Sequence, residues 1–552
     1  MGFTGLTLTI PMGQGGLRTD DSPTVLQPTD LIVANNVNFH SNLIEKDSGS
    51  VRFNTSAISG GVLAVYDWWP TFDVNERKLV VIGGDGKVYS INNLGVVSEI
   101  TASGGAPATL DISNQFFFLA CGRESNTQPR TLFIFNGINP VQVVSGTGVV
   151  RTDMSAPNSD WGAGNYPTAA FSHRGAVWAY GVGTNPHVVY RSLFTDHEDF
   201  NTTPARYTVY QGEAERLVAS ILFRGKPFIY KSPFGLYAMD DSDANPVNWF
   251  FSRVSGIFGA ASPNSPVEAL NDILVKTPSD SLLSFAATQQ FGDVTASDTL
   301  EIMNIAQFIR DNTDPLGSPF TWAIYYAEKK TLYVTYRGSG TTSNTRMLSI
   351  RLDVNGKPKA AWITKDAPYC LALRKDTQGI PRPLYGSLDG YVYLMDQTSR
   401  NVNNTAYIGE FQTPHMDFGF VDARVSGQLD SKNKLYQYLE MRYYPQGDYP
   451  IYVDVSIDGN YTETLQFDQE SDDLLADVSP QSNDFMLSDS STDPDGSFLS
   501  GEDVKFLRRK LNGQGRTISF RVYNAGLNQS FKIASLLVAF KAGGNQERTS
   551  ST

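Results

Sequence analysis

The acidic segment 468–503 contains the spacing in this sequence that comes nearest to a metal site. A twelve-residue calcium loop that started at Ser491 would place oxygen ligands at its third, fifth and twelfth positions, which are Asp493, Asp495 and Glu502. A serine at the first position removes one charged ligand, and no helical pattern leads into the loop. We therefore keep these three acids as a calcium candidate and expect an acidic loop without metal as the default.

The run Asp-His-Glu-Asp at residues 196–199 has residue types that could bind a metal or transfer protons. Neighbouring residues on a strand point to opposite sides, so these four side chains cannot all face one ion there. We expect a solvated turn instead. The chain has five histidines, and no two of them have a ligand spacing such as His-x-x-x-His: His40, His173, His187, His197 and His415. We expect each of them to be a structural or surface residue.

No catalytic motif is found in the sequence. Residues 13–16, Gly-Gln-Gly-Gly, lack the Lys-Ser/Thr that completes a phosphate loop, and there is no Gly-x-Ser-x-Gly elbow. Paired carboxylates for glycoside hydrolysis remain open, because acids far apart in sequence can meet in space. The sequence thus predicts no catalytic residue, no cofactor and no metal beyond the calcium candidate.

Composition and charge narrow the class of protein. Only 18% of the 552 residues are charged and 12% are aromatic, which favours strands over helices. The net charge is −13, but residues 468–503 hold eleven acids and no base, so the rest of the chain is near −2. This is not the basic footprint of a nucleic-acid-binding protein. No membrane-spanning helix or secretory signal is expected, and Cys121 and Cys370 are expected to be buried free thiols in a reducing compartment.

Hairpin signals recur along the first four hundred residues. Apolar runs flank tight turns at Asp85-Gly86 and Asp389-Gly390, and a similar hairpin is expected at 227–240. Residues 131–137 are expected to be the second strand of another hairpin of this kind. The aromatic positions Tyr89, Phe133, Tyr237 and Tyr393 are separated by 44, 104 and 156 residues, near multiples of a unit of about 45–52 residues. The chain is therefore predicted to be all-β, with a six- to seven-bladed β-propeller over 55–400. An ordinary β-sandwich with coincidental spacing is the alternative.

The remainder of the chain is expected to form two further parts. Residues 1–54 are predicted to be an N-terminal arm with the first strands, and residues 401–552 a β-sandwich-like domain that carries the acidic insertion 468–503. Short helices are expected at 300–310 and 503–511. The basic residues from Lys505 to Lys510 are expected to neutralise neighbouring acids or to pair across a subunit contact.

Two stretches of the sequence, residues 11–49 and 190–200, carry recognisable short motifs. Residues 11–49 contain PMGQGGLRTDDSP, then ANNVNF, then LIEKDSG, and residues 190–200 read YRSLFTDHEDF. These phrases resemble those of tail nozzle proteins from short-tailed bacteriophages, also called tail tubular protein B or packaged-DNA stabilisation proteins. Arg18 stands where that family usually has Asn, His197 replaces Pro and Phe200 replaces Trp. The resemblance spans most of residues 5–400 and is weakest after residue 400.

The resemblance implies a structural virion protein without catalytic residues. Six copies would form a ring below the portal and its adaptor ring and would extend the channel through which DNA leaves. The implied partners are further copies of the chain, the adaptor, tail fibre or needle proteins and, transiently, the exiting DNA, with no membrane. The implied location is the virion tail, assembled in the host cytoplasm. A carbohydrate-active propeller and a receptor-binding module of a phage tail are the alternatives.

Overall fold

A computed structural model describes residues 5–542, apart from 13–14, 41–42, 72, 102–108, 123–129, 146–149, 152, 203–204, 211–213, 258, 287–296, 354–355, 365–366, 377, 420–428, 430–431 and 470–503. The chain divides into two units. Unit 1 combines residues 1–48 with 399–552, and unit 2 holds residues 49–398. The segment 1–54, expected to form an arm of its own, thus contributes to both units.

Unit 2 contains seven sets of four antiparallel strands, and six of these sets are separate four-stranded sheets. The sixth set in chain order, β28 to β31, is the one that is not a separate sheet, and all seven sets are called sheets below. The first contains β8 (Val62–Trp68), β9 (Lys78–Gly83), β10 (Val88–Ile91) and β11 (Val97–Glu99). The second contains β12 (Phe117–Cys121), β13 (Thr131–Phe135), β14 (Gln142–Val144) and β15 (Val150–Arg151). The third contains β16 (Ala169–His173), β17 (Ala176–Val182), β18 (Asn185–Arg191) and β19 (Ala205–Thr208). The fourth contains β20 (Arg216–Phe223), β21 (Lys226–Ser232), β22 (Leu236–Asp240) and β23 (Phe250–Ser255).

The last three sheets complete the series. The fifth contains β24 (Pro266–Ala269), β25 (Asp272–Lys276), β26 (Leu282–Ser284) and β27 (Ser297–Asp298). The sixth contains β28 (Ala323–Tyr326), β29 (Thr331–Arg337), β30 (Asn344–Leu352) and β31 (Pro358–Thr364). The seventh contains β32 (Cys370–Lys375), β33 (Pro381–Gly386) and β34 (Val392–Gln397), and takes its fourth strand, β7 (Gly49–Arg52), from the start of the unit.

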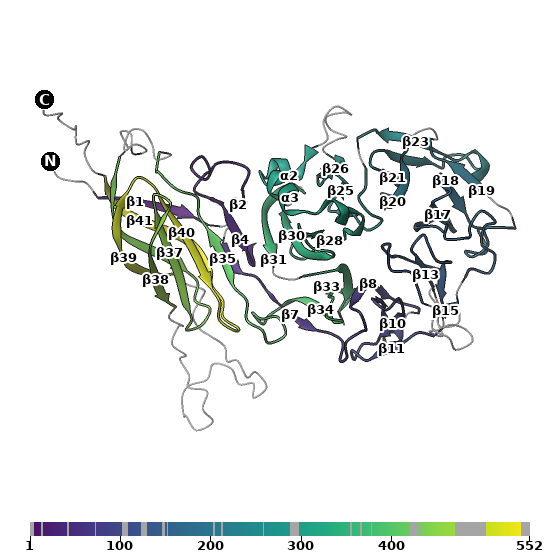
Figure 1. The fold of residues 1–552 in the computed structure, drawn as a ribbon, viewed down its shortest axis with the longest axis horizontal. Helices are drawn as coiled ribbons and strands as arrows, with labels where there is room; N and C mark the ends of the chain where they lie inside the picture. Colours follow the sequence, from purple (N-terminus) through teal and green to yellow (C-terminus); the bar gives the residue numbers. More distant parts are fainter. Residues whose placement is uncertain are drawn as a thin grey trace, which may run out of the picture. The chain divides into compact units, whose positions relative to one another are not determined.

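The seven sheets follow one another around a ring, as the labels in Figure 1 show. Contacts join the first strands of successive sheets in the order β12, β16, β20, β24, β28, β32 and β8. Between β8 and β12 the rings of Tyr66 and Phe118 stack with centroids 5.5 Å apart. Sheets repeated radially in this way are the arrangement of a β-propeller. The pairing of β7 with β34 joins the two ends of unit 2 in one sheet.

The two predicted Asp-Gly hairpins have the same local structure in different sheets, which confirms that part of the prediction. Tyr89 and Tyr393 each donate a hydroxyl hydrogen bond of 2.6 Å to the aspartate four residues earlier, Asp85 and Asp389. Each aspartate also accepts the backbone N–H two residues after it, at 3.1 Å. The side chain therefore closes the turn from both sides, which explains why this hairpin shape recurs.

Residues 131–135 form the second strand of a hairpin, β12–β13, as expected, but Phe133 is not equivalent to the other three aromatic positions. Phe133 lies in β13, the second strand of its sheet. Across the next turn it pairs with Val143 of β14. The aromatic Tyr89, Tyr237 and Tyr393 all lie in third strands. The pattern of apolar residues before an Asn or Asp occurs in second and third strands alike, because both are interior strands of their sheets, and it does not tell one from the other.

Unit 1 contains two sheets that mix strands from both ends of the chain. One has the order β39-β36-β41-β6-β5, with β1 also pairing with β41, and the other includes the strands β4-β35-β40-β37-β38 in that order. The N-terminal strands are β1 (Gly5–Pro11), β4 (Val33–Asn35), β5 (Val37–His40) and β6 (Leu43–Lys46), beside the parallel pair β2 (Gly16–Leu17) and β3 (Asp30–Leu31). The others are β35 (Gly409–Gln412), β36 (Lys434–Tyr443), β37 (Pro450–Ile457), β38 (Asn460–Asp468), β39 (Lys505–Gly515), β40 (Ile518–Asn524) and β41 (Lys532–Ala542).

Helices are few among the described residues. The expected helix at 300–310 is present as α2 (Thr299–Ile302) and α3 (Ala306–Asn312), and there are short 3₁₀ turns η1 (Val74–Glu76), η2 (Pro246–Asn248) and η3 (Pro315–Phe320). The expected helix at 503–511 is wrong for its described residues, because residues 505–511 begin strand β39, which pairs along its whole length with β36. No helix in the described part of the chain has the length and apolar character needed to cross a bilayer.

Candidate functional site

The calcium candidate Asp493, Asp495 and Glu502 lies outside the described residues. Within the described ranges, no group of three His, Cys, Asp or Glu side chains is placed to hold a metal ion. The run 196–199 forms a turn after β18. Asp196 accepts the backbone N–H of Glu198 at 3.0 Å, so its carboxylate supports the turn and does not face a common centre with its neighbours.

A cavity of about 740 Å³ lies among the first strands of unit 2. Residues of β8, β12, β20, β24, β28 and β32 line it, so six of the seven sheets contribute to its wall. This position follows from the radial arrangement, in which the first strand of each sheet faces the axis. The lining includes five aromatic side chains: Tyr66, Trp69, Phe117, Phe118 and Trp322.

Asp67 is the one carboxylate among the described residues that line this cavity. Arg77 donates to both of its oxygens, at 2.8 and 2.6 Å, and Trp69 Nε1 donates at 3.2 Å. The backbone N–H of Lys375 adds a fourth bond at 3.3 Å. The guanidinium of Arg77 also lies 4.4 Å from the centre of the Trp69 ring. A carboxylate held by this many donors is an anchor between strands, and its oxygens are not free to take a proton from a substrate.

The cavity does not bring together the residues that glycoside hydrolysis needs. That reaction uses two carboxyl groups on either side of the scissile bond. The described lining supplies Asp67 alone, already paired with Arg77. Sequence reasoning missed this pair, and the available signal was weak: an aspartate before Trp-Trp-Pro, with an arginine ten residues later, directly before the next strand. The aromatic wall offers apolar and stacking contacts.

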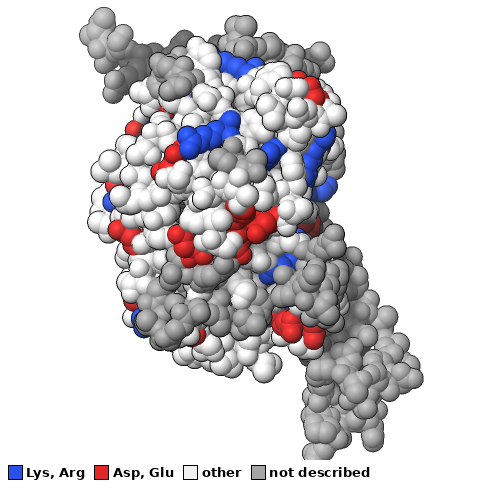
Figure 2. All heavy atoms as spheres, turned by 90° about the vertical axis from the view of Figure 1, so that its right-hand side faces the viewer, with Lys and Arg blue, Asp and Glu red and all other residues white. Residues whose placement is uncertain are grey.

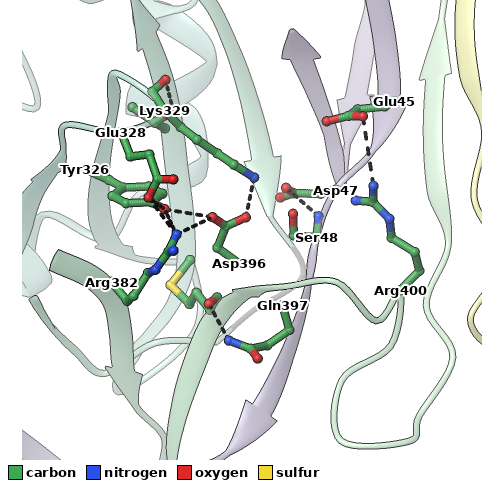
Figure 3. A network of polar contacts seen from close by, with 12 residues as sticks. Glu45, Asp47, Ser48, Tyr326, Glu328, Lys329, Arg382, Asp396, Gln397 and Arg400 are labelled. Carbon is green, nitrogen blue, oxygen red and sulfur yellow. Dashed lines mark hydrogen bonds and ion pairs between the residues drawn. The ribbon is translucent and has the colours of Figure 1, made fainter. Parts of the chain in front are cut away.

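A second polar cluster joins the sixth and seventh sheets of unit 2 (Figure 3). The hydroxyl of Tyr326 lies 2.7 Å from Glu328 and 2.8 Å from Asp396. Arg382 donates to the Tyr326 hydroxyl at 2.9 Å and to Glu328 at 2.6 Å, and Lys329 pairs with Asp396. Burial, with the nearby carboxylates, raises the pKa of the Tyr326 hydroxyl, which therefore stays protonated. The cluster links neighbouring sheets and holds two carboxylates in ion pairs.

The N-terminal phrases supply anchors within unit 1. Lys46 is fully buried, and its ammonium donates to Asn524 Oδ1 and to the carbonyl of Gly526, both at 3.2 Å. Asp30 is also buried and pairs with Arg18 at 3.1 Å. A buried ammonium or carboxylate needs such partners to offset its lost hydration. Lys46 therefore fastens β6 to the C-terminal part of unit 1, and the Arg18–Asp30 pair joins the ends of β2 and β3.

The phrase at 190–200 packs the third sheet. Tyr190 is buried, and its hydroxyl donates to Asp160 at 3.1 Å. Phe200 is buried with its ring 4.8 Å from that of Trp161. Ser192 accepts the N–H of Val177 at 3.0 Å. The described contacts of this phrase are packing and turn contacts.

Comparison with known proteins gives no family. No protein-family model matches the sequence, and no curated protein matches it. Among solved structures, one match is BBS1N in complex with ARL6DN, with a TM-score of 0.37 at 11% identity, covering 64% of this chain and 97% of the other. Another is an exo-beta-1,3-galactanase from Phanerochaete chrysosporium, with a TM-score of 0.29 at 10% identity, covering 90% of this chain and 100% of the other. A third is an extracellular domain of a putative hybrid two component system from B. thetaiotaomicron, with a TM-score of 0.38 at 10% identity, covering 76% and 53%. Likenesses at these TM-scores carry no argument about function.

Proposed function

We propose that this chain is a structural subunit of the tail nozzle of a short-tailed bacteriophage. In this proposal unit 2 is a seven-bladed propeller and unit 1 a β-sandwich-like domain. Six copies form a ring below the adaptor and extend the channel for DNA. The observation that carries the proposal is the order of the phrases at 11–49 and 190–200, which resemble that family.

The distribution of charge supports a conduit. Basic walls would bind the phosphates of passing DNA through many contacts and would slow it. Outside the acidic segment 468–503 the chain is near −2 overall, and the face in Figure 2 carries separate groups of acidic and basic side chains with uncharged surface between them. Such a surface neither grips nor strongly repels DNA, and the acidic segment adds repulsion at one place.

A structural role also agrees with the state of the charged groups in unit 2. Asp67 and the carboxylates of the cluster around Tyr326 are held by Arg77, Arg382 and Lys329. A second candidate, binding of a glycan by the propeller, is favoured by the five aromatic rings at the 740 Å³ cavity, because sugars stack on aromatic faces. Binding of capsule or lipopolysaccharide fragments to the purified chain would favour that candidate.

The oligomeric state tests the nozzle proposal. Native mass spectrometry of the purified chain, alone and with the adaptor from the same virion, should show species of six copies of the 60.6 kDa chain. Imaging of the particles should show these copies as a ring in the tail. A trimer would favour a receptor-binding module. A monomer that does not assemble on the adaptor would contradict the proposal.

A further inference from the structure

The outer face of strands β36 and β39 in unit 1 carries basic and aromatic side chains in facing positions. The cross-strand pairs on this face are Tyr438–Lys510, Glu440–Arg508 and Arg442–Phe506. Side chains two residues apart on a strand share a face, so the six form one patch. The patch has three cations and a single carboxylate, and therefore an excess of two positive charges.

Glu440 lies between two arginines and fixes both. It accepts Arg508 Nη2 at 2.8 Å and Arg442 Nε at 3.3 Å, while only 5% of it is exposed. The hydrogen bond from Arg508 holds the pKa of the Glu440 carboxyl below its ordinary value, so it is charged at neutral pH. Arg508 also lies over the Tyr438 ring, 4.3 Å from its centre. Both guanidinium groups are thus oriented before any ligand arrives.

A hollow of about 390 Å³ opens between these arginines. Its lining residues are Glu440, Arg442, Val504, Phe506 and Arg508. Each arginine gives one N–H to Glu440, and within the described residues no second acceptor is bonded to either. Arg442 and Arg508 side chains are 44% and 53% exposed, and Phe506 is 66% exposed. Pre-oriented guanidinium donors beside an exposed ring suit carboxylate groups on a peptide.

The sequence that precedes the hollow has the complementary charge. Residues 470–503 contain ten acidic residues and no basic residue, and they join β39 through Val504, which itself lines the hollow. A ligand tethered at the rim of its site has a local concentration in the range of about millimolar. We propose that the hollow binds carboxylates of segment 470–503 of the same chain, with Arg442 and Arg508 as the groups that bind them. This inference does not depend on the nozzle proposal.

Competition by a free peptide tests it. The probe is a fluorescein-labelled peptide of residues 470–503, titrated by anisotropy into the full chain and into a variant in which all ten acids of that segment are changed to Asn or Gln. The variant should bind the peptide at least tenfold more tightly, because its own segment no longer competes. Raising the salt from 50 to 200 mM should weaken this binding.

Single arginine variants in the neutral-segment background locate the site. Arg442→Gln and Arg508→Gln should each weaken peptide binding at least tenfold. Arg509→Gln is the matched control, since Arg509 lies on the opposite face of β39 and donates to Gln466 O, and it should stay within twofold. Circular dichroism confirms that each variant is folded. Equal binding by the full chain and the neutral variant, no effect of Arg442→Gln, or tighter binding of a single-stranded DNA of equal charge would each overturn the proposal.

Discussion

Several buried charges in the described part of this protein have partners of opposite charge, and Asp67 shows what that arrangement contributes. Its carboxylate and the Arg77 guanidinium are 9% and 3% exposed and form a two-bond pair next to the central cavity of unit 2. Neither charge could be buried alone at an acceptable free energy. The pair therefore fixes the first sheet at the point where its first strand ends.

Replacing Arg77 by Met should destabilise unit 2 strongly. Asp67 would remain buried without its counter-charge, and the expected loss in free energy of unfolding is about 3–5 kcal/mol. Urea unfolding followed by tryptophan fluorescence measures this. The exposed pair Lys87–Glu99, at 3.0 Å, provides the control, because Lys87→Met should cost less than about 1 kcal/mol. Similar losses in the free energy of unfolding for Arg77→Met and Lys87→Met would show that the buried pair does not stabilise the protein more than the exposed pair.

The two thiols should be unreactive in the native chain. Both cysteines are buried and free, and burial raises the pKa of the Cys121 thiol to about 12 and also raises that of Cys370. Ellman's reagent at pH 8 should therefore detect almost no thiol until urea is added, and then two per chain. Rapid reaction of one equivalent without urea would mean that one of these sites opens readily.

The site residues show where sequence reasoning stops. The turn aspartates Asp85 and Asp389 were predicted because their partners are four residues away or fewer. Asp67 and Arg77 were not, because their contact requires the register of β8 and β9, which a sequence pattern does not give. The basic patch on β39 was noticed as a charge run, but its partner Glu440 lies 68 residues earlier in the chain.

At the scale of elements, turn signals predicted hairpins between adjacent strands, but no sequence signal predicted the pairing of strands far apart in the chain. Turn residues between apolar runs predicted β9–β10 and β33–β34 well. Strand β39 was mistaken for a helix because its charged residues are spaced so as to fit either period over a short stretch. Strand β7 could not be foreseen in the seventh sheet, since its partner β34 follows more than three hundred residues later and nothing in Gly49–Arg52 specifies it.

The turn glycine of the Asp-Gly hairpin in the seventh sheet, Gly390, is expected to be required for full stability. Gly390 has φ +86°, and a Cβ there would lie 2.4 Å from the carbonyl oxygen of Ile58. Gly225, in the turn between β20 and β21, has φ +77° with nothing within 4 Å of its Cβ position. Both changes to Ala incur backbone strain of about 1–2 kcal/mol, and Gly390→Ala should lose a further 1–3 kcal/mol or so through the clash. Thermal melting compares them, and equal losses would contradict the steric explanation.

At the scale of the whole molecule, each unit is completed by residues that come early in the chain. Unit 1 needs β1 and β6 to pair with β41, and β4 to pair with β35, although 350 residues of unit 2 separate these segments. Unit 2 needs β7 as the fourth strand of its last sheet. Pairing the first and last segments of a ring of sheets leaves no gap at which it can open, and it removes an exposed strand edge.

Fragments of the chain should reveal these dependencies. Residues 49–398 include β7 and should unfold cooperatively on their own. Residues 55–398 lack it, so β34 loses its pairing with Val51 and Arg52 and becomes an edge strand. We expect a lower unfolding midpoint for the shorter fragment and faster amide exchange in β34, whereas β25, which pairs within its own hairpins in the fifth sheet, should exchange alike in both. Residues 399–552 should fold only when a peptide of residues 1–48 is added, because β41 would otherwise lose its pairing with β1 and β6, and β35 its pairing with β4. Identical melting and amide exchange of fragments 49–398 and 55–398 would mean that β7 does not stabilise unit 2. Cooperative folding of residues 399–552 alone would mean that the N-terminal strands are not needed for unit 1 to fold.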